Sequence, residues 1–175
     1  IRMDKKRLQQ ITAPLLTWFA EHARDLPWRI RPTAYRVWVS EIMLQQTRVE
    51  AVKPVYARLM EALPDVTDLA ACPEDRLLKL WEGLGYYSRV RNMQKAARMI
   101  CEQYDGVMPV DYETLLTLPG IGSYTAGAIA SIAGGEAAPA VDGNVLRVVT
   151  RICESRADIM KQSVKKEVEA DLRQV

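Results

Sequence analysis

The chain has 175 residues, a net charge of +2 at pH 7 and 49% hydrophobic residues. This composition excludes a disordered chain, and the length is sufficient for one large domain or two small lobes, each with a core. The near-neutral charge argues against a globally basic nucleic-acid binder, so any such affinity must come from a local patch or from backbone amides. The single histidine, His22, argues against histidine-based catalytic triads and Cys/His zinc modules.

The three cysteines, Cys72, Cys101 and Cys153, are widely spaced and form no C-x-x-C pair. This usage fits small core residues in a reducing cytosol. No apolar run approaches the roughly 18 residues of a membrane span, and the amino end lacks the apolar region of a signal peptide. We therefore expect neither a transmembrane segment nor export.

The hydrophobic pattern is helical along almost the whole chain. An amphipathic first helix carries Leu8, Ile11, Leu15 and Phe19 on one face. Proline and glycine then divide the chain into further expected helices at 35–47, 49–63, 66–71, 74–82, 86 or 88 to 104, 111–116, 121 or 123 to 133, from about 142, and from 164 to the end. No segment alternates as a strand should. The sequence therefore predicts an all-α protein with short connections.

One stretch, Leu-Pro-Gly-Ile-Gly-Ser-Tyr-Thr-Ala-Gly at 118–127, predicts a tight hairpin followed by a helix of small residues. Gly120, Gly122 and Ser123 would present backbone N–H groups at the start of that helix. Such a start carries partial positive charge and unpaired donors, so it can hold a phosphate without a cationic side chain. A DNA backbone is the ligand we expect.

Two other nucleotide-binding loops do not fit this stretch. A dinucleotide fingerprint requires a third glycine where Thr125 stands, and a P-loop requires a Gly-Lys-Ser/Thr triplet that is absent. A plain turn between two helices, with no ligand, remains an alternative interpretation of this stretch. A local basic patch at Arg89, Arg91, Lys95 and Arg98 is a second candidate DNA contact, although a solvated helix face is the commoner explanation of such a run.

Glu41 is the first of two candidate catalytic carboxylates. Its neighbours at helical spacing are uncharged, and they are Val37, Trp38, Leu44 and Gln45. Burial without a cation favours the protonated acid, which can act as a general acid. The alternative is a glutamate at the edge of the core, hydrogen-bonded to another helix.

Asp142 is the second candidate, and it precedes Gly143, Asn144 and a valine-rich helix. Aspartate is a preferred helix N-cap, and a helix start also favours the ionised carboxylate, so a capping and a functional role are compatible. A protonated acid paired with a fixed anion suits the cleavage of a bond to carbon 1 of a sugar. The acid protonates the leaving group, and the anion stabilises the cationic sugar or attacks it.

Together these stretches resemble the helix-hairpin-helix DNA glycosylases, and among them the MutY-type adenine DNA glycosylases. The resemblance covers roughly residues 5–153 and is carried by Leu26-Pro27-Trp28-Arg29, the Glu41 helix with Met43-Leu44-Gln45-Gln46-Thr47, Trp81-Glu82-Gly83-Leu84-Gly85-Tyr86-Tyr87, the hairpin at 118–127, and Asp142-Gly143-Asn144-Val145. Any one motif is weak, but the set is specific.

The resemblance implies removal of adenine mispaired with 8-oxoguanine or guanine in double-stranded DNA, by a monomer in the bacterial cytoplasm at the nucleoid. It assigns protonation of adenine N7 to Glu41 and stabilisation of the oxocarbenium-like sugar to Asp142, with Asn144 beside it. Tyr124 stands where a lysine would give a strand-cleaving lyase. Tyrosine has no amine with which to form a Schiff base, so simple hydrolysis is expected.

The resemblance also implies how DNA is held, because members of the family flip the adenine into a pocket. It assigns Arg24, Trp28 and Leu44 to the surroundings of that pocket, and it assigns wedging of the duplex and reading of 8-oxoguanine to Gln46, Thr47, Leu84 and Tyr86. Ordinary core packing is the alternative for Trp28, Leu44 and Leu84. The implied monovalent cation would bind backbone carbonyls at Leu116, Leu118 and Ile121.

One departure concerns the four-iron four-sulfur cluster expected of full-length family members, which is followed by a further carboxy-terminal domain. The three cysteines of this chain do not supply the compact spacing of a cluster motif. We therefore expect a fragment of a longer enzyme, of doubtful activity alone. Residues 26–136 would form a six-helix lobe with the helix-hairpin-helix near 112–133, and residues 1–25 with 137–175 would form a partial second lobe.

Two alternatives remain. An endonuclease-III-like glycosylase and lyase for oxidised pyrimidines would share the hairpin, but Tyr124 and Glu41 argue against it. A noncatalytic helix-hairpin-helix module would use the hairpin for phosphate contacts alone.

Overall fold

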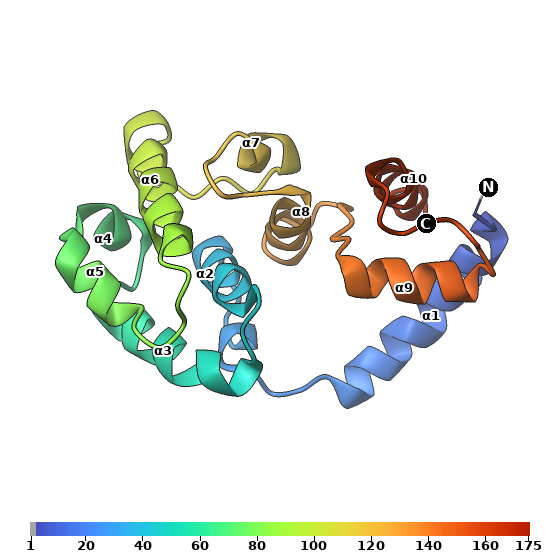
Figure 1. The fold of residues 1–175 in the computed structure, drawn as a ribbon, viewed down its shortest axis with the longest axis horizontal. Helices are drawn as coiled ribbons and strands as arrows, with labels where there is room; N and C mark the ends of the chain where they lie inside the picture. The colour runs from blue at the N-terminus through green and yellow to red at the C-terminus, as the bar shows by residue number, and fades with distance from the viewer. Residues whose placement is uncertain (1–2) are drawn as a thin grey trace. The chain divides into compact units, whose positions relative to one another are not determined.

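The computed structural model describes residues 3–175, and all regular structure in that range is helical (Figure 1). The prediction of an all-α protein is confirmed. None of the helices in this range is long and apolar enough to cross a membrane. The chain divides into two compact units: Leu26–Glu136, and the residues up to Asp25 together with Ala137–Val175.

The unit Leu26–Glu136 begins with a short 3-10 turn and continues with seven α-helices, one for each segment expected in this range. The five-residue helix just before the hairpin is capped by Asp111. The elements are η1 (Pro27–Arg29), α2 (Ala34–Leu44), α3 (Val49–Ala62), α4 (Val66–Ala71), α5 (Glu74–Leu80), α6 (Ser88–Gln103), α7 (Tyr112–Leu116) and α8 (Ser123–Ile132).

Side-chain caps explain where several of these helices begin. The Thr33 side chain accepts from the Arg36 N–H at the start of α2, and Asp65 accepts from two N–H groups at the start of α4. Asp111 accepts from the Thr114 N–H at the start of α7, at 2.9 Å. Each bond satisfies a donor that a helix start leaves unpaired.

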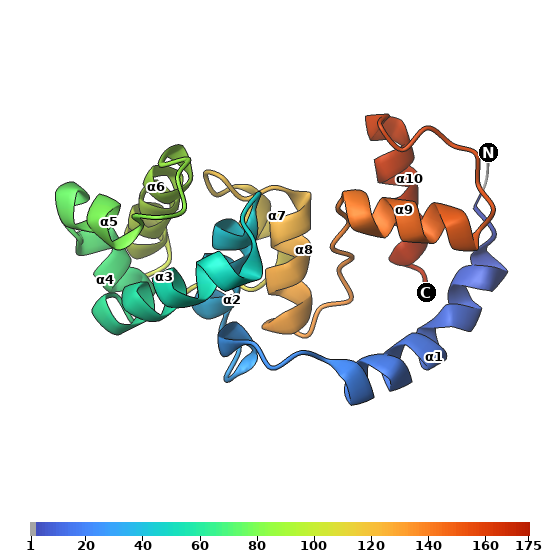
Figure 2. The same cartoon turned by 60° about the horizontal axis from the view of Figure 1, so that its bottom comes forward.

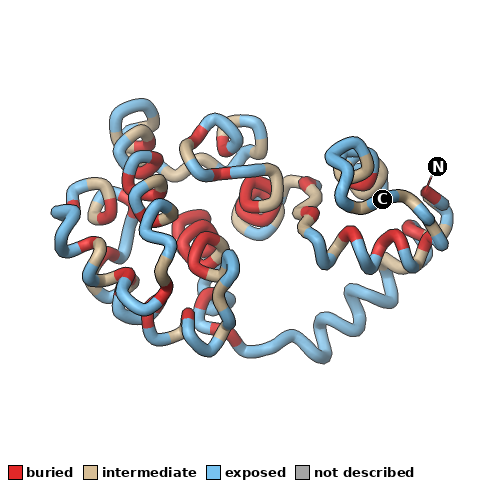
Figure 3. Tube along the Cα trace, in the orientation of Figure 1, coloured by how far each residue is buried: buried red, intermediate tan, exposed pale blue. Residues whose placement is uncertain are grey.

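The core of this unit is built around α2 and α8, which pack against each other (Figure 2). Helix α8 buries every residue from Thr125 to Ala130, and all of them except Ile129 are small, so its backbone can approach α2 closely. Trp38 of α2 and Trp81, which follows α5, are fully buried. Figure 3 shows the buried residues concentrated along these two central helices.

Gly134 sets the closest backbone approach near the hairpin. A Cβ built at this residue would lie 2.5 Å from the Val110 carbonyl oxygen and 2.7 Å from the Ala130 carbonyl oxygen. The Glu136 carboxylate accepts from the Tyr112 N–H at 2.9 Å. The segments before α7 and after α8 are therefore tied together behind the hairpin.

Two helices end earlier than the sequence predicts. The helix expected to reach Thr47 ends at Leu44, because Gln45 is extended and Gln46 has a positive φ of 56°. The helix expected to reach Glu82 ends at Leu80. In both places the backbone leaves the helical conformation, and arginine side chains described below donate hydrogen bonds to its carbonyl oxygens.

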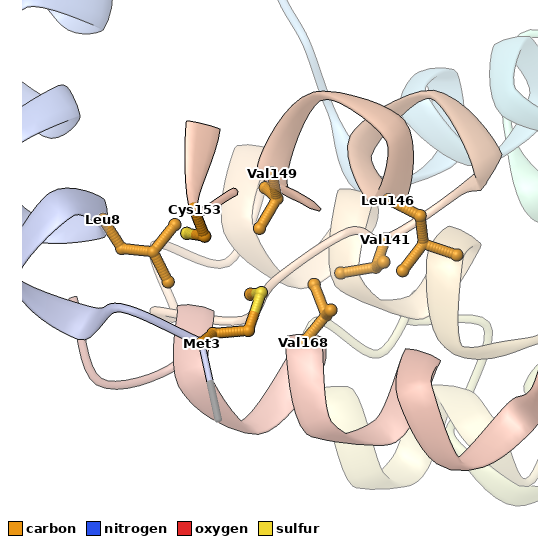
Figure 4. Packing of buried hydrophobic residues seen from close by; sticks show 7 residues of the cluster. All are labelled: Met3, Leu8, Val141, Leu146, Val149, Cys153 and Val168. Carbon is orange, nitrogen blue, oxygen red and sulfur yellow. The ribbon is translucent and has the colours of Figure 1, made fainter. Parts of the chain in front are cut away.

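The other unit contains α1 (Lys5–His22), α9 (Gly143–Ile152) and α10 (Gln162–Leu172), with α9 in contact with both of the others. Its core is a cluster of seven buried residues, shown in Figure 4: Met3, Leu8, Val141, Leu146, Val149, Cys153 and Val168. Only the first half of α1 joins this cluster. The second half is exposed, and its large apolar residues are Leu15, Leu16, Trp18 and Phe19.

Candidate functional site

The predicted hairpin is present between α7 and α8. Its turn is closed by the Ile121 N–H, which donates to the Leu118 carbonyl at 3.2 Å, and Leu118 and Ile121 are buried while Leu116 is exposed. Gly120 has a positive φ of 75°, a region that glycine adopts without steric cost. The carbonyl cation site at Leu116, Leu118 and Ile121 stays a prediction.

The second glycine of the hairpin has a different role. Gly122 has a φ of −93°, which any residue can adopt, and it occupies the N-cap of α8. A Cβ built there meets no atom within 4 Å, so the space in front of it is open. None of the described side chains caps this helix start. This helix start is therefore open beside Gly122 and has no side-chain cap, as a phosphate site requires.

The first turn of α8 carries two further predicted residues. Ser123 and Tyr124 are half-buried, next to the open N-cap at Gly122. Tyr124 is thus two residues after the N-cap of the candidate phosphate site. Its role as the residue that decides between hydrolysis and lyase chemistry stays a prediction.

Helix α2 carries Glu41 near its carboxyl end. Glu41 is half-buried, between the buried residues Ser40 and Ile42. Leu44 is half-buried at the last position of the helix, whereas Gln46, two residues further on, is exposed. Thr47 is half-buried, and its hydroxyl donates to the Gln45 carbonyl at 3.3 Å. The predicted duplex-reading residues 46 and 47 therefore lie on an irregular turn rather than on the helix.

The loop from Trp81 to Tyr87 contains three residues with positive φ. They are Gly83 at 104°, Gly85 at 65° and Tyr86 at 45°. Tyr86 is 66% exposed, which leaves its ring available to a partner, whereas Leu84 is only 6% exposed. The Leu84 side chain is therefore packed in this structure, and the packing alternative for it is the better supported one.

Trp28 is also packed, with 6% of its surface exposed and its ring edge-on to Tyr56 at 5.4 Å between ring centroids. Core packing thus accounts for Trp28 without a ligand. Arg24 is exposed and belongs to the other unit, after the end of α1.

The basic patch on α6 is not a single solvated face. Arg91 forms an exposed ion pair with Glu74 at 2.8 Å, and Arg98 donates to the Ala70 carbonyl at 3.3 Å. Arg89 is half-buried, and its guanidinium donates to carbonyl oxygens of α2 and of the 81–87 loop. The Arg89 guanidinium thus binds the protein's own backbone, and a DNA contact by this residue stays a prediction.

The first turns of α6 bring the predicted DNA-contacting segments of this unit together. A cavity of about 170 Å³ is lined by residues of α2, α6 and the hairpin, among them Gln45, Arg89, Asn92 and Gly120. The end of α2, the 81–87 loop and the hairpin thus share α6 as a common support. The sequence identified the three segments but not this support.

Asp142 lies in the other unit, at the N-cap of α9. Its Oδ1 accepts from the Val145 N–H at 2.9 Å, and its Oδ2 accepts from the Asn144 side-chain amide at 3.1 Å. The Asn144 Oδ1 in turn accepts from the Arg147 guanidinium at 2.5 Å. The capping role is therefore realised, and Asn144 is held beside the carboxylate as the resemblance implies. Sequence reasoning missed Arg147.

The cysteines do not form a metal or cluster site. Cys72 and Cys153 are buried in different units, and burial raises the pKa of both thiols, which disfavours the thiolate that a cluster requires. Within residues 3–175, no three His, Cys, Asp or Glu side chains are grouped so that they could hold a metal ion. The residues of this chain do not fit a four-iron four-sulfur cluster, and no step below runs through one.

Comparison with known proteins gives the family. Residues 39–174 match the model of the HhH-GPD superfamily base excision DNA repair protein. The chain is 47% identical to the human adenine DNA glycosylase over 89% of this chain and 30% of that protein. It is 46% identical to the adenine DNA glycosylase of Mycolicibacterium smegmatis over 82% of this chain and 50% of that protein. The chain thus spans about a third to a half of these relatives.

Two solved structures have the same fold as this chain. A thermostable thymine-DNA glycosylase has a TM-score of 0.82 at 26% identity, covering 95% of this chain and 78% of that one. A trapped covalent complex of endonuclease III with DNA has a TM-score of 0.81 at 28% identity, covering 99% and 78%. Since the family model matches most of the chain, the protein belongs to the HhH-GPD superfamily of base excision DNA repair proteins.

Proposed function

We propose that the protein is an adenine DNA glycosylase that hydrolyses the N-glycosidic bond of adenine mispaired with 8-oxoguanine in duplex DNA. The observation that carries the proposal is the likeness to the adenine DNA glycosylases of human and Mycolicibacterium smegmatis, at 47% and 46% identity. Each in its own unit, Glu41 is half-buried near the end of α2, and Asp142 accepts two hydrogen bonds at a helix start. These unlike settings support different roles for the two carboxylates.

The chemistry divides between the two side chains. Glu41 donates its proton to N7 of the flipped adenine, and the electron pair of the C1′–N9 bond leaves with the base. The ionised Asp142 stabilises the positive charge that develops on the sugar. Water adds to C1′ and its proton restores Glu41, so the products are adenine and an abasic site.

DNA binding is assigned to the three segments supported by α6. Backbone N–H groups at Gly122 and Ser123 hold a phosphate, which gives affinity without sequence preference. The turn at Gln46 and Thr47 and the exposed ring of Tyr86 contact the mispair. The complexes of endonuclease III with DNA support a duplex substrate for this fold.

A glycosylase with lyase activity is the second candidate, and the likeness to a trapped covalent endonuclease III complex favours it. Lyase chemistry requires an amine, and position 124 carries a tyrosine. The 28% identity to endonuclease III is also well below the 47% to an adenine DNA glycosylase. Borohydride with abasic DNA separates the two, since efficient covalent capture would establish the lyase and exclude simple hydrolysis.

The decisive experiment is single-turnover release of adenine from an A:8-oxoguanine duplex by the full-length gene product. Glu41→Gln and Asp142→Asn keep the size of each side chain, and each should abolish release while most DNA affinity is retained. Normal release by both variants would refute the assigned roles. Wild-type release of an oxidised pyrimidine but not of adenine would refute the substrate.

A further inference from the structure

Arg89 makes an unusual set of contacts for a residue on an amphipathic helix. One terminal nitrogen donates to the Ile42 carbonyl at 2.8 Å and to the Gln45 carbonyl at 2.6 Å, and lies 3.4 Å from the Met43 carbonyl. The other terminal nitrogen donates to the carbonyls of Leu84 at 3.2 Å and Gly85 at 3.4 Å. One guanidinium therefore joins the end of α2 to the 81–87 loop.

The guanidinium is also held by aromatic rings of the loop it binds. It lies 5.4 Å from the centroid of the Trp81 ring and 5.7 Å from that of Tyr86, within the range of cation–π attraction. The Trp81 indole N–H donates to the Gly85 carbonyl at 3.1 Å. Arg58 holds the start of the same loop by donating to the Leu80 and Glu82 carbonyls. Of these two arginines, Arg89 is the one that contacts both the loop and the end of α2.

The residues next to the bound carbonyls are in a conformation that needs support. Gln46 follows Gln45 with a φ of 56°, and Tyr86 follows Gly85 with a φ of 45°. Non-glycine residues adopt this left-handed region only where the surrounding structure holds them there. Arg89 binds the carbonyl directly before each of them, so it is placed to hold both turns at once.

We infer that Arg89 is a positioning residue that couples the Gln46 turn to the Tyr86 turn, so that both contact a mispair in one fixed arrangement. This inference rests on the proposed function, which assigns mispair contact to these turns. A planar guanidinium with donors on two nitrogens can serve two sets of carbonyls, whereas a lysine ammonium is a single point and can serve only one. The coupling therefore requires arginine and not merely a positive charge.

The first test needs no activity. Amide hydrogen exchange is followed in peptides spanning 42–47 and 82–88, for the full-length wild type, Arg89→Lys and Arg89→Gln. In Arg89→Gln both peptides should exchange roughly tenfold faster, and in Arg89→Lys at least one of them should, while peptides from α3 and α8 are unchanged. Unchanged exchange in either loop of Arg89→Gln, unchanged exchange in both loops of Arg89→Lys, or faster exchange throughout the protein would refute the coupling.

The second test measures selectivity. The ratio of the dissociation constants for a fully paired duplex and an A:8-oxoguanine duplex is determined at fixed salt concentration. Arg89→Lys, which retains the charge, should lower this ratio about tenfold while binding to the fully paired duplex changes little. Arg76→Gln, which removes an exposed positive charge from α5, is the control and should retain the wild-type ratio.

The outcomes separate this inference from the proposed function. If the wild type releases adenine and Arg89→Lys retains its selectivity, the coupling is refuted and the function stands. If the wild type releases no adenine but both loops exchange faster in the Arg89 variants, the function is refuted while the coupling of the two turns stands. If Arg89→Gln does not fold, Arg89→Lys decides both tests.

Discussion

Asn92 of α6 lies directly against Gly120 of the hairpin, so that a Cβ built at Gly120 would be 3.1 Å from the Asn92 Cβ. Asn92 is one helical turn beyond Arg89, and both line the cavity between α2, α6 and the hairpin. The position of the hairpin is therefore set by contact with the helix that also holds the two neighbouring turns.

Gly120→Ala should lower stability through this contact and through its backbone conformation. A non-glycine residue at a φ of 75° costs about 1–3 kcal/mol, and the close Asn92 side chain gives it little room. Urea unfolding would measure the loss. Gly122→Ala is the matched control, because its φ is ordinary and its surroundings are open, so we expect a smaller loss, of no more than about 1 kcal/mol, from the poorer N-cap. Equal losses would contradict this distinction.

Gly122→Val tests the candidate phosphate site. The side chain fits the fold but occupies the open space in front of the α8 N-terminus, where a phosphate would approach. Binding to duplexes of different sequence should weaken by about the same factor, because the lost contact is to the backbone. Titrations at one salt concentration would measure it. A loss confined to certain sequences would argue for base contacts instead.

Two substitutions of Asp142 should separate its role as a helix cap from its role in catalysis. Asparagine caps a helix about as well as aspartate, so Asp142→Asn should retain the free energy of unfolding, whereas Asp142→Ala should lose about 1 kcal/mol with the Val145 hydrogen bond. Both variants should lose adenine release, since neither carries the charge. Release that follows stability rather than charge would assign Asp142 to capping alone. The comparison needs unfolding curves and single-turnover rates on the same preparations.

The buried phenol of Tyr35 leads to a prediction for how stability decreases at alkaline pH. Burial raises the pKa of its phenol, which donates to the Leu63 carbonyl at 2.8 Å. Above about pH 10 the unfolded chain loses this proton and the folded chain keeps it, so stability declines by about 1 kcal/mol per pH unit. Tyr35→Phe should start about 1 kcal/mol less stable at pH 8 and decline less steeply. If the stability of the wild type and that of Tyr35→Phe fall equally steeply between pH 8 and 11, this assignment would be contradicted.

Much of the fold was predictable because local signals agree with one another. The starts of several helices are marked by the proline before Asp65, by Asp111 and Asp142, and by the regular apolar spacing. The structure places these helix starts within a few residues of the predicted positions. The hairpin was predictable because a positive φ at Gly120 and an open N-cap at Gly122 both depend on glycine.

The remainder depends on contacts between distant segments. Gln46 and Tyr86 adopt a backbone conformation that their residue types do not favour, so no local pattern predicts it. In the sequence, Arg89 is one member of a basic run. Its hydrogen bonds to the Ile42 and Gln45 carbonyls join residues that are 47 and 44 positions apart, and they form only in the folded chain. The packing of Trp28 and Leu84 likewise depends on which neighbours the fold supplies.

Gly134 has a consequence for how this region can change over evolution. The place that a Cβ would take at position 134 is occupied by the carbonyl oxygens of Val110 and Ala130, so no side chain fits between these two backbone segments. Any other residue would force at least one of the two segments to move. The site behind the hairpin therefore restricts position 134 to glycine, although this residue is remote from the open N-cap.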